Sequence, residues 1–68
     1  MDPATVERRL ANVAKQAVKG DHVTAHDFEY VLWKDVLIAI ANGTCQSPKN
    51  CAAMALRTTK LDFHRWPV

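Results

Sequence analysis

The sequence has little glycine, little cysteine and few aromatic side chains. Gly20 and Gly43 are the only glycines, so the chain has no glycine-rich loop of the kind that cradles a phosphate group. Aromatic residues make up 7% of the chain. No apolar run approaches the roughly 18 residues that a membrane-spanning helix needs. These shortages argue against a phosphate-loop enzyme and against an integral membrane protein.

Cysteine is limited to Cys45 and Cys51. The N-terminal stretch MDPATVERRL has no apolar signal region, so we expect a cytoplasmic chain with reduced thiols. Together with His22 and His26, the two thiols would be a tetrahedral zinc set, but the cysteine spacing does not match that of known zinc fingers. We therefore predict no metal and no other cofactor. Since no set of side chains resembles a catalytic site, we also predict that the chain is not an enzyme.

Length and composition indicate one small folded unit. The chain has 68 residues, of which 49% are hydrophobic, and this composition is too apolar for a disordered protein. A chain of this length buries only about 60% of its unfolded surface, so its core is small. We predict a single helical domain that covers residues 1–68.

One stretch, from Thr24 to Gly43, predicts a long central helix. Thr24 is the predicted N-cap and Gly43 the stop signal. After Glu29, only Lys34 and Asp35 interrupt the apolar run, which predicts a helix covered on more than one side. The predicted core stripe places Leu32 and Val36 at its centre, nearly fully buried, and it also contains Phe28, Trp33, Leu37, Ala39 and Ile40.

Helix signals also flank the central stretch. Asp2 and Pro3 are typical of the start of a helix that ends at Gly20. Ser47 and Pro48 predict another helix, which runs to Arg57. A last, short helix is predicted from Lys60 to Trp66. The sequence therefore predicts an all-α protein, a small bundle of three main helices plus a short C-terminal helix.

The C-terminal stretch contains the string Ala52-Ala53-x-x-Leu56-x-x-Thr59-x-x-x-Phe63-x-Arg65-Trp66. This string resembles the C-terminal helix-turn-helix of Fis-type bacterial regulators. The resemblance implies a recognition helix that carries Lys60, His64 and Arg65 on its outer face, where it would meet duplex DNA. The alternative is that Leu61, Phe63 and Trp66 simply cover the core.

Charge is distributed unevenly along the chain. Both ends are basic and the middle is acidic, with a net charge of +2. A mixed solvated surface would explain this pattern, and so would a basic face that meets phosphate. The leading expectation is a small nucleic-acid-binding regulator. Its expected contacts with nucleic acid are Lys60, His64 and Arg65, with Lys49, Arg8 and Arg9 on phosphate.

A second function is also open. Val31 and Ile38 are seven residues apart and lie away from the predicted core stripe of the central helix. Either the C-terminal segment covers them, or they bind another protein. In that alternative the chain is an adaptor or inhibitor, of the size encoded by phages or mobile elements, and it binds a larger host protein through Tyr30, Val31, Ile38 and Trp66. Homodimer formation is open in both cases.

Overall fold

The structure, a computed structural model, describes residues 1–65. These residues form three α-helices, α1 (Pro3–Val18), α2 (His22–Ala41) and α3 (Pro48–Ala55), and a 3-10 helix, η1 (Leu56–Lys60), that continues α3 without a break. Residues 1–65 contain no β-strand. The predicted all-α bundle of three main helices and a short C-terminal helix is confirmed.

The first helix has the predicted ends. The backbone N–H of Thr5 donates to Asp2 Oδ1 at 2.8 Å, so Asp2 caps α1, and Pro3 occupies the first helical turn. Gly20 follows the helix with a φ of +79°, a left-handed conformation that glycine adopts without strain. Along the helix, Val6 and Val13 are fully buried.

The second helix starts earlier than predicted. Its N-cap is Asp21, whose carboxylate accepts from the backbone N–H of Thr24 at 3.2 Å. The predicted cap at Thr24 is therefore wrong, because Asp21 offers a cap one turn sooner and Thr24 becomes its donor. The C-terminal end is as predicted, with Asn42 as C-cap and Gly43 at a φ of +76°.

The third helix ends in a tighter turn than predicted. The Thr59 hydroxyl donates to the Leu56 carbonyl at 2.7 Å, and the Leu61 N–H donates to the Thr58 carbonyl at 3.0 Å. These bonds close η1 at Lys60, and Leu61 is extended. The predicted range of the short C-terminal helix, Lys60 to Trp66, is wrong, because residues 61–65 are not helical and residue 66 lies outside the described residues.

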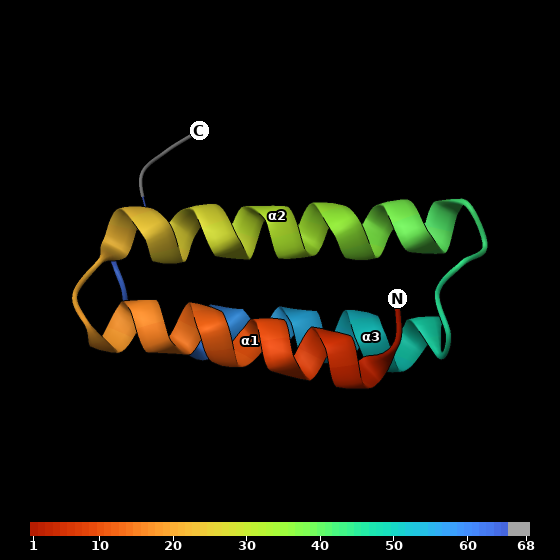
Figure 1. The fold of residues 1–68 in the computed structure, drawn as a ribbon, viewed down its shortest axis with the longest axis horizontal. Coiled ribbons are helices and arrows are strands. Elements are labelled where there is room, and N and C mark those ends of the chain that lie inside the picture. Colours follow the sequence, from red (N-terminus) through yellow and green to blue (C-terminus); the bar gives the residue numbers. More distant parts are fainter. Residues whose placement is uncertain (66–68) are drawn as a thin grey trace.

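The three helices lie side by side, and every pair is in contact (Figure 1). In Figure 1, α1 and α3 run in one direction and α2 runs in the other. The Cα atoms span 34 × 24 × 15 Å, so the molecule is a thin slab in which each helix has an outer face. None of the described helices is long and apolar enough to cross a lipid bilayer.

Two clusters of buried side chains form the core. Val6, Leu32, Val36, Cys51 and Ala55 make the larger cluster. The smaller cluster contains Val13, Ala25 and Phe63, so the C-terminal segment contributes to the core, as the covering alternative predicted.

The predicted core stripe of the central helix is only partly right. Leu32 and Val36 are 0% and 2% exposed, which confirms their predicted burial. Phe28 and Leu37 were predicted to be buried, but they are 41% and 66% exposed. Both α1 and α3 pack on one side of α2, and within residues 1–65 no helix covers its far side.

Candidate interaction surface

Exposed apolar side chains gather on the side of α2 that faces away from α1 and α3. Helical periodicity places the buried residues of α2 on one side and a second set of residues, all exposed, on the other. We call this second set the outward face of α2, and its residues are Val23, Asp27, Tyr30, Val31, Lys34, Leu37, Ile38 and Ala41.

The outward face of α2 is mostly apolar. Tyr30 is 60% exposed, Val31 43% and Ile38 49%. The charged residues on this face, Asp27 and Lys34, lie along its centre line, seven residues apart. The surface of a solvated helix is normally polar, so an apolar face of this length is typical of a surface that contacts another macromolecule.

The described part of the C-terminal segment does not cover the outward face. Phe63 packs with Ala25 on the buried side of α2, and the backbone N–H of His64 donates to Nδ1 of His22 at 2.6 Å. Residues 61–65 therefore close the end of the bundle where α2 begins (Figure 1). The structure leaves Tyr30, Val31 and Ile38 exposed, as the interaction alternative predicted. Trp66, its fourth residue, lies outside the described residues.

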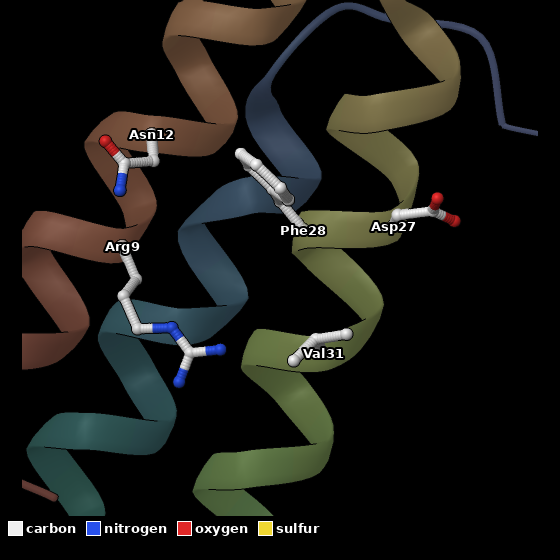
Figure 2. Close-up of a pocket in the computed structure, with 5 residues that line it drawn as sticks. All are labelled: Arg9, Asn12, Asp27, Phe28 and Val31. Atoms are coloured by element: carbon white, nitrogen blue, oxygen red, sulfur yellow. The ribbon is translucent and has the colours of Figure 1, made fainter.

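A shallow hollow flanks the outward face on the α1 side. It has a volume of about 370 Å³ and is lined by Arg9, Asn12, Asp27, Phe28 and Val31. Figure 2 shows the Phe28 ring between the two helices, directed toward α1, and the Asp27 carboxylate directed away from α1. The hollow is open, and it extends the apolar surface of Val31 sideways.

A second hollow flanks the outward face on the α3 side. It has a volume of about 200 Å³ and an entirely apolar lining of Trp33, Val36, Leu37, Ala52, Ala55 and Leu56. Leu56 is 57% exposed, so it continues the apolar surface from Leu37 onto the next helix. The outward face thus has a hollow on each side, and its apolar side chains are interrupted along the centre by Asp27 and Lys34.

Arg65, one of the three residues predicted to contact nucleic acid from the recognition helix, is engaged inside the fold. Its guanidinium donates to both oxygens of the Glu29 carboxylate, at 2.8 and 3.0 Å, and to the Thr58 carbonyl at 2.8 Å. The guanidinium also stacks on the Phe63 ring, with 3.8 Å between Cζ and the ring centroid. These contacts fasten the C-terminal segment to α2.

Glu29 stands on the buried side of α2 and is 5% exposed. Burial alone would raise the pKa of Glu29, but hydrogen bonds from Arg65 and Thr58, together with the Arg65 charge, outweigh burial and hold that pKa below its ordinary value. The sequence analysis missed this network. The available signal was a carboxylate on the side of α2 that also carries Leu32 and Val36, but nothing in the sequence pairs it with Arg65.

The other predicted nucleic-acid residues are not gathered into one site. Lys49 lies in the first turn of α3 and Lys60 ends η1, so the two lysines stand at opposite ends of the same helical rod. Arg9 pairs with Asp35 at 2.9 Å, and its neighbour Arg8 is exposed. His64 is exposed beside the start of α2.

The four side chains considered for zinc do not come together. His22 is the first residue of α2 and Cys45 lies beyond its last, and a helix of this length spans about 30 Å. Residues 1–65 contain no group of three or more histidine, cysteine or acidic side chains that could hold a metal ion. Cys51 is fully buried, and burial and the adjacent Cys45 raise the pKa of its thiol.

Comparison of the chain with family models, with curated proteins and with solved structures found no match. The interpretation of the surface therefore depends on its own geometry and chemistry.

Proposed function

We propose that this chain is a protein-interaction module, an adaptor or inhibitor and not an enzyme, and that it binds protein through the outward face of α2. The supporting observation is the exposure of Tyr30, Val31, Leu37 and Ile38 along one helix. A domain this small has few apolar side chains to bury. Each one left in water contributes nothing to the hydrophobic stabilisation of the fold. A bound protein would remove these side chains from water.

Nucleic-acid binding, the leading expectation from the sequence, stays a prediction with less support. Its recognition helix would need helical residues beyond Lys60, and residues 61–65 are not helical. The Arg65 guanidinium is in an ion pair with the Glu29 carboxylate. The basic charge at both ends of the chain still supports the nucleic-acid prediction. We place the interaction activity in the cytoplasm, where the thiols of Cys45 and Cys51 stay reduced.

A paired substitution tests the proposed function. Val31→Asp together with Ile38→Asp puts two charges on the outward face without touching the core, because both side chains are already exposed. The matched control is Val18→Asp, at the end of α1, where the side chain is 88% exposed and lies off this face. Each variant and the wild type would be immobilised, exposed to extract from the producing cells, and analysed for retained proteins by mass spectrometry.

The wild type and Val18→Asp should retain the same protein, and the doubly substituted chain should lose it. Circular dichroism should show the same helical content in all three proteins. Retention of that protein by the doubly substituted chain would contradict the proposal, as would the absence of any protein retained by the wild type.

A further inference from the structure

The outward face of α2 has an internal symmetry of residue type. Read from the middle toward both ends, Tyr30 and Val31 are the central apolar pair. Asp27 lies on one side of them and Lys34 at the same distance on the other, and Val23 and Ile38 stand at equal distances farther out. In chain order, the first three of these residues are apolar, acidic and apolar (Val23, Asp27, Tyr30). The last three are apolar, basic and apolar (Val31, Lys34, Ile38). For these six residues, reversal of the helix exchanges the acid for the base and leaves the apolar positions apolar. The other two residues of the face, Leu37 and Ala41, have no apolar counterpart, because reversal places them level with Thr24 and Gly20.

We propose that the occupant of this face is a second copy of the chain, with the two α2 helices antiparallel about a two-fold axis between Tyr30 and Val31. This inference rests on the proposed function, because it uses the same surface. The two-fold axis places Asp27 of one copy level with Lys34 of the other, and it does so twice. The apolar side chains at both ends then meet apolar side chains of the partner.

Charge selects this orientation and this register. In a parallel pair, Asp27 would face Asp27 and Lys34 would face Lys34, and like charges repel. In an antiparallel pair that is shifted by one turn, Asp27 of one copy no longer lies opposite Lys34 of the other, so the attraction between them is weakened. The paired stretch from Val23 to Ile38 is about 23 Å long, so most of the helix takes part. Exposed Leu37 and Leu56 widen the apolar contact toward α3.

Charge-exchanged variants test the inference in the full chain. Asp27→Lys alone leaves two positive charges level with each other at both contacts, and Lys34→Asp alone leaves two negative charges. Each single variant should dimerise about tenfold or more weakly than the wild type, since attraction is replaced by repulsion at two symmetric sites. Glu7→Lys, on the exposed side of α1, is the matched control for net charge and should dimerise like the wild type.

The decisive sample is an equimolar mixture of the Asp27→Lys chain and the Lys34→Asp chain. In the mixed pair, each chain with two lysines on its outward face meets a chain with two aspartates there, so both contacts are attractive again. Sedimentation equilibrium should show monomers for each variant alone and dimers for the mixture. The chain that carries both substitutions should dimerise like the wild type.

A wild-type chain that stays monomeric at every accessible concentration would overturn the inference. So would a dimer that the single variants do not weaken, because such a dimer uses another surface. The proposed function has a separate outcome. If the wild type is monomeric and still retains a different protein that the Val31→Asp, Ile38→Asp chain loses, the face binds protein and only the identity of the occupant is wrong.

Discussion

The Glu29–Arg65 ion pair shows how single residues position the C-terminal segment. Taking a carboxylate out of water is costly, and the structure compensates with two hydrogen bonds from one guanidinium. The same guanidinium donates to the carbonyls of Thr58, Leu61 and Phe63. Arg65 therefore fixes both the charge of Glu29 and the path of the chain after η1.

Replacement of Arg65 should destabilise the fold. Arg65→Met leaves Glu29 buried without its partner, and we expect a loss toward the low end of the roughly 3–5 kcal/mol that breaking a buried pair costs, because Arg65 is partly exposed. The double variant Glu29→Met, Arg65→Met removes the stranded charge and should recover much of that loss. Urea unfolding of the three proteins measures both effects. Equal stability of the single and double variants would show that Glu29 does not need its partner.

The same carboxylate should make stability depend on pH. The pKa of Glu29 is lowered in the fold, so its contribution is fully present above the unfolded-state value and is lost as pH falls through the folded value. Hydrogen bonds from Thr5 and Thr24 likewise lower the pKa of Asp2 and of Asp21. We expect the wild type to lose stability over the interval that begins at about pH 5, where unfolded carboxyl groups start to bind protons, and extends down through the lowered folded-state values. Glu29→Gln should lose less over the same interval, and an unchanged loss would contradict the assignment.

Leu32 is the largest fully buried side chain in the larger core cluster. It is fully buried on α2 and packs in the same cluster as Val6, Val36 and Cys51. Leu32→Ala should lower the free energy of unfolding by about 2–5 kcal/mol, from lost burial and the cavity left behind. Leu37→Ala, at an exposed position on the same helix, is the control and should change stability far less. A thermal melt of Leu32→Ala that matches the wild type would refute this assignment.

At the level of elements, α3 begins in a strained conformation. Ser47 has φ 54° and ψ 60°, and its side chain makes no capping hydrogen bond. The left-handed conformation disfavours any residue with a Cβ, whereas glycine adopts it freely. Ser47→Gly should therefore stabilise the protein by about 0.5–1 kcal/mol, after allowance for the greater freedom of glycine in the unfolded chain. Ser47→Ala should have little effect, and a clear loss with alanine would reveal a cap that the structure does not contain.

Helix ends and helix faces differed in how well the sequence predicted them. Local signals such as Asp2-Pro3, Gly20 and Asn42-Gly43 act within one turn, so they located the ends of α1 and the end of α2. The face of α2 that is buried depends on where α1 and α3 pack, which is not local information. The charged residues of α2 do not share one side, because Glu29 is on the buried side and Asp27 and Lys34 are on the outward face. The sequence therefore did not show the orientation of the helix, and Leu37 was assigned to the core although it is exposed.

Over the whole molecule, the distribution of basic residues bears on the nucleic-acid prediction. Arg65 and Arg9 are in ion pairs, so Lys49 and Lys60 are the better probes. If the chain binds duplex DNA through these lysines, Lys49→Ala with Lys60→Ala should flatten the salt dependence of binding by about two units. Under the proposed function, the same variant should retain protein through α2 as well as the wild type does. Titrations of labelled duplex at several salt concentrations would separate the two outcomes.

The three-helix architecture followed from the sequence, but the candidate surface only partly did. The spacing of Val31 and Ile38 singled them out, and the thin slab leaves both exposed. Val23 and Leu37 could be assigned to the outward face only from the packing of the helices in the structure. The contact between Glu29 and Arg65 joins residues 36 positions apart, and no periodicity could have linked them.

The Glu29–Arg65 contact also has a consequence for the evolution of the chain. A descendant that loses the arginine keeps a carboxylate buried in its core, and one that loses the glutamate keeps a guanidinium without its counter-charge. Neither single step should persist for long, so the two positions should change together or not at all. Among divergent copies of this sequence, residues 29 and 65 should therefore covary, with the charged pair replaced as a unit by two apolar residues.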